Sequence, residues 1–388
     1  MRSSLMSKLE INQKLFWFLL SILGLFILVG FFSAHIMEEE GHHITGMNNQ
    51  IIWGLPHVFA VMLIIISSGV LNTATLSSVF DKTLFKPLAP LSALFAVAFL
   101  ISGLLILVLD LGRPDRLVVA MTVYNFKSIF AWNIFLYSGF FAILVIYIWS
   151  MLDFTVKKHS KAVGTFAFIW RIVLTTGTGS IFGFLIAREA YATAILAPLF
   201  IVMSLLYGTA IYYLLYNLIC KLNKKIISLE ITQNFIKLLR IFLYINLYFL
   251  ILYHLTNIYI SKHIDYELFI LFNGGIYTFL FWLGQILLGI IIPILVLSNK
   301  NMSISSLLVI VGGFIGIWVI IIGGQAYPLN MFPNHEIVES SFYDSGVYPY
   351  TPSLYEIALG LGSIALTLFI ILAAIANLKF IPIDENKY

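Results

Sequence analysis

The stretch NNQIIWGLPHVFAVMLIIISSGVLN, residues 48–72, decides the fold. An apolar run of about 20 residues is long enough to cross a bilayer as a helix, and this run carries a histidine, His57, near its start. A second stretch, LVLDLGRPDRLVVAMTVYNFKSIFAWN (residues 107–133), ends another apolar run on an aspartate, Asp110. Ionisable groups inside or beside membrane segments are costly and usually functional. His57 and Asp110 are therefore the first candidates for chemistry.

The composition of the whole chain indicates an integral membrane protein. Of its 388 residues, 61% are hydrophobic and 10% are charged, whereas soluble domains carry about 25% charged residues. The single cysteine, Cys220, excludes an internal disulfide, a Cys-ligated iron–sulfur cluster and a CxxCH haem attachment. The first apolar run lacks a small-residue cleavage site, so we expect it to be retained as a span. The net charge of +4 falls mainly in loops and does not point to nucleic acid.

We expect an all-α fold of about ten transmembrane helices, forming one polytopic domain over residues 1–388. Open strands would leave backbone groups unpaired in lipid, and a β-barrel would alternate polar and apolar residues. The length leaves no room for a large soluble domain. The expected spans are residues 14–35, 51–75, 88–110, 129–151, 162–186, 194–219, 238–259, 268–297, 303–323 and 353–376.

The distribution of positive charge predicts the orientation. With a cytoplasmic N-terminus, the inside segments carry 16 Lys and Arg residues and the outside segments carry 5. Lys and Arg concentrate in short cytoplasmic loops, so both termini are expected in the cytoplasm and the protein in the bacterial inner membrane. The outer loops are longer, and the last one before residue 353 is rich in Pro, Gly and Tyr. Elaborate loops on one face favour function on that face.

This topology places most polar residues of the spans toward the outer leaflet. His57 is expected six residues into its span, roughly 9 Å below the outer end at 1.5 Å per residue. Asp110 closes the third span, and Arg171 is the main exception, in the inner half of the fifth. The other outer polar residues are Asn133, Glu189, His254 and Glu356.

Each of these residues also has a purely structural interpretation. His57 can hydrogen-bond a neighbouring helix, Asp110 can pair with Arg113 or Arg116, and Glu189 can end a helix in solvent. The Glu38–His43 loop has metal-ligand residue types but no ordered spacing. Small residues within the spans, such as Ser67–Gly69 and Gly274–Gly275, favour close helix packing, although broken-helix ion sites of transporters have a similar composition.

The functional interpretation is a pocket for a redox lipid. Quinone reduction takes two electrons and two protons, so its carbonyls need titratable hydrogen-bond donors such as His and a carboxylate. A cleft between helices suits the ring and its isoprenoid tail. Only His57 and His254 lie within spans, which excludes the usual two-haem arrangement with four membrane histidines.

Several segments resemble the NrfD/PsrC family, the membrane subunits of polysulfide reductase-like complexes. They are residues 48–72, KPLAPLSAL (86–94), LVLDLGRPDR (107–116) and YNFKSIFAWNIFLY (124–137). TTGTGSIFGFLIAREAY (175–191), IIGGQAYPLNMFP (321–333) and YTPSLYEIALGLG (350–362) resemble the DsrP-type branch, found in a sulfur-metabolism complex. The resemblance covers about residues 40–376, and ten spans fit the longer branch of the family.

The resemblance implies an NrfD/PsrC-like helical bundle without haem or iron–sulfur cluster, which exchanges electrons between the quinone pool and a periplasmic ferredoxin-like iron–sulfur subunit. The quinone, menaquinone or ubiquinone, would be a substrate. A haem b membrane subunit and a multihaem cytochrome c would be companions. By motif position, His57 and Asp110 become candidate quinone- or proton-handling groups, and Tyr124, Asn133 and Arg113 become secondary candidates. His254, Glu189 and Glu356 rest on depth and chemistry alone.

Two other functions stay open at this level. A structural anchor would hold redox partners at the membrane without touching quinone. A secondary transporter would place its polar groups near the midplane, whereas here they gather near one face.

Overall fold

The computed structural model describes residues 6–153, 155–329 and 346–382. Within these ranges ten helices are long and apolar enough to cross a membrane, which confirms the expected all-α, multi-pass architecture. They span Gln13–Glu40, Leu55–Ser78, Thr83–Leu109, Ile129–Leu152, Lys157–Gly183, Leu196–Leu222, Leu229–Tyr259, Ile276–Val296, Met302–Ala326 and Leu354–Asn377.

Some spans are one regular helix and others are built from consecutive pieces. The long helices are α1 (Gln13–Glu40), α2 (Leu55–Val70), α4 (Ala89–Leu109), α6 (Ile129–Leu152), α7 (Ser160–Gly183), α8 (Leu196–Leu222), α9 (Leu229–Tyr259), α13 (Met302–Trp318) and α15 (Leu354–Asn377). The short α-helices are α3 (Asn72–Ser78), α5 (Leu117–Thr122), α10 (Ile264–Leu268), α11 (Ile276–Phe279), α12 (Ile292–Val296) and α14 (Gly324–Ala326). Three π-helical pieces are η6 (Phe269–Asn273), η7 (Leu280–Ile291) and η8 (Val319–Gly323).

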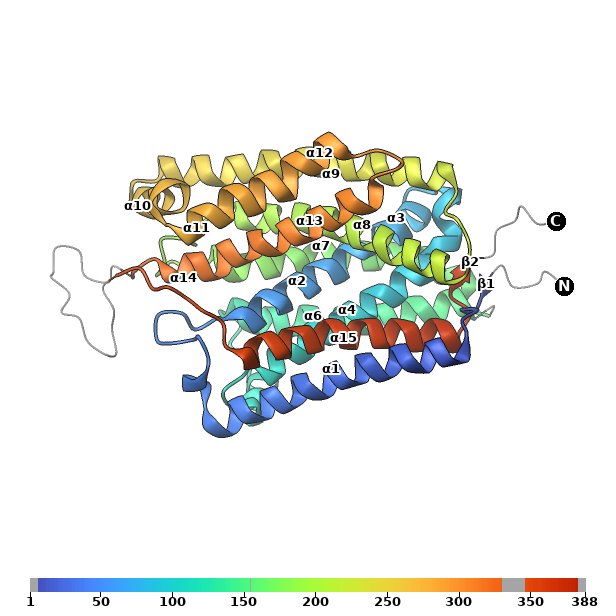
Figure 1. Cartoon of the computed structure of the whole chain (residues 1–388), viewed down its shortest axis with the longest axis horizontal. Helices are drawn as coiled ribbons and strands as arrows, with labels where there is room; N and C mark the ends of the chain where they lie inside the picture. The colour runs from blue at the N-terminus through green and yellow to red at the C-terminus, as the bar shows by residue number, and fades with distance from the viewer. Residues whose placement is uncertain (1–5, 154, 330–345, 383–388) are drawn as a thin grey trace.

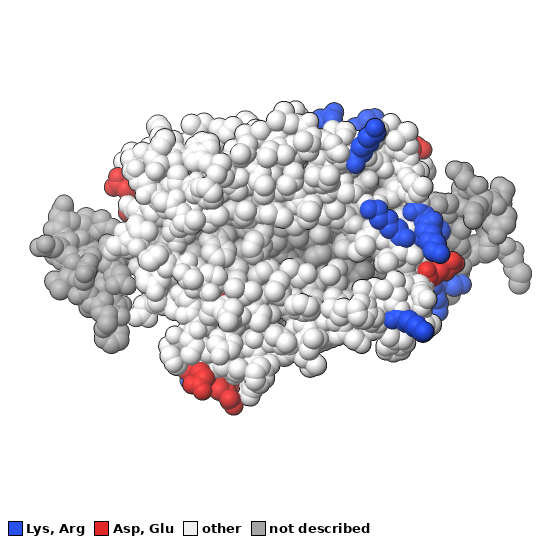
Figure 2. All heavy atoms as spheres, in the orientation of Figure 1, with Lys and Arg blue, Asp and Glu red and all other residues white. Residues whose placement is uncertain are grey.

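Five short 3-10 helices and two strands complete the description. The 3-10 helices are η1 (His42–Ile44), η2 (Thr83–Leu88), η3 (Pro114–Arg116), η4 (Lys157–His159) and η5 (Ser261–His263). The strands β1 (Met6–Ser7) and β2 (Ile381–Pro382) pair antiparallel, so the two ends of the described chain meet at one end of the bundle. The Lys and Arg residues visible in Figure 2 gather at that same end. The positive-inside rule therefore assigns this end to the cytoplasm.

The helices form two groups of four with two flanking helices. In the first group α2 packs on α4, α4 on α6, and α6 on α7; in the second, α8 packs on α9 and α13, and α13 on η7. Both α2 and α7 pack on α8, which joins the groups. Helices α1 and α15 lie side by side along one flank, where α15 contacts α4 (Figure 1). The first helix is thus peripheral, and few of its residues are buried.

The contact between the two groups depends on glycine. A Cβ on Gly69 of α2 would lie 1.8 Å from the carbonyl oxygen of Ser204, and one on Gly208 of α8 would lie 2.0 Å from the carbonyl carbon of Gly69. The two backbones therefore touch, as at other small-residue crossings in membranes. Here the packing interpretation of Ser67–Gly69 is correct.

Two spans differ from the expected ranges. The seventh helix starts at Leu229 instead of near residue 238, with Ser228 as its N-cap. The eighth apolar run, expected to cross from residue 268, is interrupted at Gly274–Gly275, where Gly275 has φ +57°. Glycine adopts this left-handed conformation without a steric penalty, so the spanning helix starts only at Ile276. Most of the predicted long outer loop, residues 330–345, lies outside the described residues.

Candidate functional site

The end of α4 presents a buried carboxylate. Asp110 caps α4, and its backbone N–H donates to the carbonyl oxygen of Ile106 at 3.0 Å. Its side chain is 1% exposed, with Oδ2 2.8 Å from Nδ1 of His57 and Oδ1 3.8 Å from Nε2 of His42. These are ion-pair contacts, because no described group donates a well-directed hydrogen bond to either oxygen. The carboxylate therefore keeps accepting capacity for a further donor.

His57 lies in the first turn of α2. The sequence placed it six residues into its span, but this helix starts at Leu55, with Pro56 in its first turn. Proline favours this position because its missing N–H is not needed there. The imidazole is consequently nearer the outer boundary than expected, and 19% of the side chain is exposed. Trp53 stacks on it with ring centroids 6.1 Å apart.

His42 is the third member of the cluster. It follows α1 in the short helix η1, and its Nε2 donates to the backbone carbonyl oxygen of Asp110 at 3.1 Å. The contact with the Asp110 carboxylate raises the pKa of His42, although partial burial opposes this. Burial pushes the pKa of Asp110 up, but the contacts with His42 and His57 outweigh it and hold that pKa below its ordinary value. We call His42, His57 and Asp110 the outer triad.

A second layer of polar contacts fixes the start of α2. Glu356 accepts from the backbone N–H groups of Gly46 at 2.8 Å and Ser353 at 2.7 Å, and from the hydroxyl of Tyr350. The Tyr350 oxygen in turn accepts from the N–H of Leu55 at 2.7 Å. Glu356 and Ser353 also form the capping box that starts α15. Burial, then the Glu356 carboxylate, keeps the pKa of Tyr350 far above its ordinary value, so its hydroxyl stays protonated.

The segment before His57 is tied to the second group of helices. Gln325 accepts from the N–H groups of Ile52 and Trp53 at 3.0 Å each and donates to the Trp53 carbonyl at 2.9 Å. Arg188 donates to the carbonyl oxygens of Gln50 at 2.5 Å and Gln325 at 3.1 Å. The backbone leading into His57 is therefore held from both sides.

The secondary candidates Arg113, Tyr124 and Asn133 are engaged elsewhere. Arg113 makes a two-point contact with Asp115 at 2.9 Å on the exposed surface, so the expected pairing of Asp110 with Arg113 is wrong. Tyr124 stacks on Phe135 with centroids 4.2 Å apart. Asn133 is buried and donates to the carbonyl oxygen of Gly177 at 3.1 Å, which links α6 to α7. These three residues shape the surroundings of the first helix group.

A second histidine–carboxylate cluster lies between α9 and α10. Glu267 is 1% exposed, and its Oε1 lies 2.5 Å from Nδ1 of His254. Its Oε2 accepts from Asn257 at 3.2 Å, and the Asn257 oxygen lies 3.3 Å from Nδ1 of His263. We call these four residues the α9–α10 cluster. Here His254 belongs to a site of its own and not to the outer triad.

Glu189 lies in the loop between α7 and α8 and is only partly exposed. Burial and, next, the nearby Asp265 raise its pKa, while Lys262 opposes them. It therefore faces the loop that carries the α9–α10 cluster and not the outer triad.

Arg171 is buried in the inner half of α7. It donates to the carbonyl oxygen of Ser68 at 2.9 Å and to the side-chain oxygen of Asn72 at 2.8 Å. Its guanidinium also lies over the ring of Phe168 at 5.2 Å. Because α2 ends at Val70 and α3 starts at Asn72, this arginine satisfies acceptors where the helix is interrupted.

Sequence reasoning found two of the three triad residues and missed the third. It placed His57 and Asp110 on one side of the membrane, which is where they meet. His42 stood in a loop considered only for metal binding; within the described residues no group of three or more His, Cys, Asp and Glu is arranged to hold a metal ion. Glu267 was missed although a lone acid directly before the apolar run LFILF is an available signal.

Comparison with known proteins gives a consistent set of relatives. The family model "Polysulphide reductase, NrfD" matches residues 43–328. The Hdr-like menaquinol oxidoreductase integral membrane subunit of Archaeoglobus fulgidus is 25% identical over 97% of this chain and 96% of its own. A selenate reductase subunit of Mesobacillus selenatarsenatis is 26% identical, with 97% and 95% covered. A putative dimethyl sulfoxide reductase membrane subunit of Halobacterium salinarum is 23% identical, with 94% and 91% covered.

Proposed function

The chain belongs to the polysulphide reductase NrfD family, and on that premise we propose that it is the quinone-interacting membrane subunit of an electron-transfer complex. The observation that carries the proposal is the outer triad: a buried carboxylate, contacted by two imidazoles, whose oxygens still lack a well-directed donor. A relative named as a menaquinol oxidoreductase subunit supports a quinone as the substrate.

The chemistry of the substrate fits the groups present. A quinol that becomes a quinone loses two electrons and two protons, and a quinone that is reduced takes up the same number. Asp110 accepts a hydrogen bond from a quinol hydroxyl, and His57, in contact with Asp110, exchanges the proton. His42 holds Asp110 ionised, so that the acid is ready to accept. The partly exposed imidazoles connect the site to the outer aqueous face.

The partner of this reaction is a redox subunit docked on the outer face. The triad lies at the end of the bundle opposite the chain termini, so electrons leave or enter on the non-cytoplasmic side. The finer proposal is a periplasmic ferredoxin-like iron–sulfur subunit, with a haem b membrane subunit and a multihaem cytochrome c as companions in sulfur metabolism. Its support is the family and the relatives named as subunits of reductases.

The secondary candidates take graded roles. We assign Glu356 the role of a positioning residue, since it reaches α2 through Tyr350. Asn133, Tyr124 and Arg113 support the helices and loops around the triad. His254 and Glu189 belong to the other end of the outer face and are not part of this quinone site.

The test is quinol oxidation by membranes that contain the whole complex, with His57→Ala and Asp110→Asn as variants. The proposal expects both variants to lose turnover while the complex still assembles. Wild-type turnover in both variants would refute the site. Loss of assembly without any quinol activity in the wild type would favour a purely structural anchor.

A further inference from the structure

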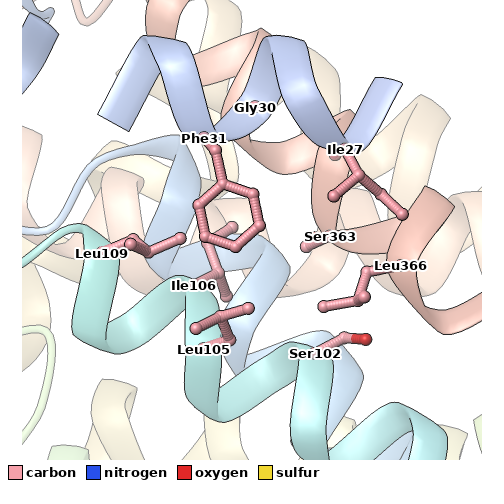
Figure 3. Close-up of a pocket in the computed structure, with 10 residues that line it drawn as sticks. Ile27, Gly30, Phe31, Ser102, Leu105, Ile106, Leu109, Ser363 and Leu366 are labelled. Carbon is pink, nitrogen blue, oxygen red and sulfur yellow. The ribbon is translucent and has the colours of Figure 1, made fainter. Parts of the chain in front are cut away.

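A hollow of about 260 Å³ lies between α1, α4 and α15 (Figure 3). Phe31 of α1 reaches across it towards Leu105 and Ile106 of α4, and Leu366 closes it from α15. The helices that form it cross the membrane, so the hollow is at hydrocarbon depth. It has no part in the triad chemistry described above.

The hollow follows from how α1 packs. At Gly30 the first helix touches α15 by backbone, since a Cβ there would lie 3.1 Å from the Cα of Gly362. This crossing holds α1 against α15 and not against α4. The space between α1 and α4 is then only partly filled by side chains.

The polar atoms of the hollow decide what can occupy it. Ser363 already donates to the carbonyl oxygen of Gly360 at 2.7 Å. The hydroxyl of Ser102 is fully buried and has no hydrogen-bond partner among the described residues. An ordered water needs two to four polar partners, which this lining does not offer. An apolar chain is the occupant that fits.

The hollow continues into the outer triad. Ile106, which lines it, is the residue whose carbonyl accepts from the N–H of Asp110. Ser102 lies two turns further, about 12 Å from Asp110 along α4. Ile106 also belongs to a small apolar cluster with Ala60, one turn after His57. A chain attached to a ring at the triad therefore has a continuous apolar route to this space.

We propose that the hollow between α1, α4 and α15 binds the first isoprene units of a quinone whose ring is held beside Asp110. This rests on the proposed function. The hollow then contributes binding energy only for a quinone that carries the tail. It makes the enzyme complex select isoprenoid quinones over tail-less ring analogues.

The test fills the hollow and compares two quinols in membranes that contain the whole complex. The variant Ser102→Leu adds bulk from α4, and Leu366→Trp adds it from α15. Gly24→Leu is the matched control, because a Cβ on Gly24 of α1 meets nothing within 4 Å. The substrates are menaquinol with a long isoprenoid tail and reduced menadione, which has the same ring without the tail.

We expect each hollow-filling variant to raise KM for the long-tailed quinol about tenfold, with KM for reduced menadione unchanged and the control like wild type. Equal changes for both quinols, or no change for either, would overturn the proposal. An acyl chain of a phospholipid as occupant would give the second of these outcomes. If the wild type oxidises neither quinol, the proposed function fails instead. Should one variant not assemble, the other carries the test.

Discussion

Asp110 in the first helix group and Glu267 in the second are both almost fully buried, and each contacts Nδ1 of a histidine. Their remaining contacts differ. Glu267 has a donor for each oxygen, His254 on one and Asn257 on the other. The oxygens of Asp110 contact His42 and His57 as ion pairs and have no well-directed donor among the described residues. The same pair of residue types is thus closed in one place and open in the other.

The difference separates a structural use of this pair from a chemical one. A buried carboxylate whose oxygens are satisfied fixes its neighbours, and here it joins α10 to α9. A carboxylate with spare accepting capacity costs stability unless a ligand supplies the donor. Burial also lowers the pKa of His263 in the α9–α10 cluster, whereas the pKa of His42 in the outer triad is raised. Of the two clusters, the outer triad is therefore the one set up to hold a cation beside an anion.

The largest expected effect comes from exchanging each carboxylate for its amide. Asp110→Asn keeps the size of the side chain but removes the charge that accepts the quinol proton. We expect quinol turnover to fall about 10²-fold or more. The matched change Glu267→Gln should leave turnover within about threefold, because we assign it no contact with substrate. Steady-state quinol oxidation in membranes measures both, and an equal loss in the two variants would end the distinction.

Stability should show the reverse order. Glu267→Gln breaks a buried set of contacts with His254 and Asn257, which we expect to cost about 1–3 kcal/mol. Asp110→Asn removes a poorly satisfied buried charge and should cost less. Thermal unfolding of the detergent-solubilised complex, read from intrinsic fluorescence, compares the two midpoints. A lower midpoint for Asp110→Asn than for Glu267→Gln would show that the outer triad is the structural element.

A smaller effect is expected from the layer behind the triad. Tyr350→Phe removes the hydroxyl that joins Glu356 to the N–H of Leu55 at the start of α2. The first turn of α2, which carries His57, then loses a fixed reference, and we expect kcat to drop roughly 3- to 10-fold. Tyr277→Phe is a suitable control, since its hydroxyl bonds to the Tyr348 carbonyl at 3.1 Å outside this connection. Equal kcat values for the two variants would argue against a positioning role.

The sequence predicted the helices well because a membrane span is a local property. A run of about 20 apolar residues identifies itself without its neighbours, and ten such helices are present in the described ranges. The exception at Gly274–Gly275 depends on a backbone conformation that hydropathy does not register. Membrane topology also placed His57 and Asp110 at the same face, since each sits at an outer helix end.

The rest of the site depends on contacts between distant parts of the chain. His42 reaches Asp110 because Glu356, more than 300 residues away, holds the N–H of Gly46 in the intervening loop. Arg113 was predicted to pair with Asp110 from proximity in sequence, but the turn at Pro114 directs it to Asp115. Such pairings follow from how helices at opposite ends of the sequence pack, and no periodicity in a single sequence encodes them.

The most delicate test of the comparison is the pH dependence of the outer triad. The pKa of His42 is raised by Asp110, so its contribution to stability is full below the ordinary histidine pKa and is lost as pH rises through the raised value. The pKa of Asp110 is lowered, so its contribution is present above the ordinary aspartate pKa and is lost as pH falls through the lowered value. The ion pair therefore holds between these two limits.

His42→Gln removes one of the two cations beside Asp110, so the pKa of that carboxyl should rise towards its ordinary range. If turnover needs ionised Asp110, the acid limb of kcat/KM for quinol oxidation then moves to higher pH, while the rate on the plateau changes little. The control His35→Gln alters an exposed histidine of α1 that pairs with Glu39 and should leave the profile in place. An acid limb that stays where it is in His42→Gln would mean that His57 alone keeps Asp110 charged, and His42 would then be a support for the loop.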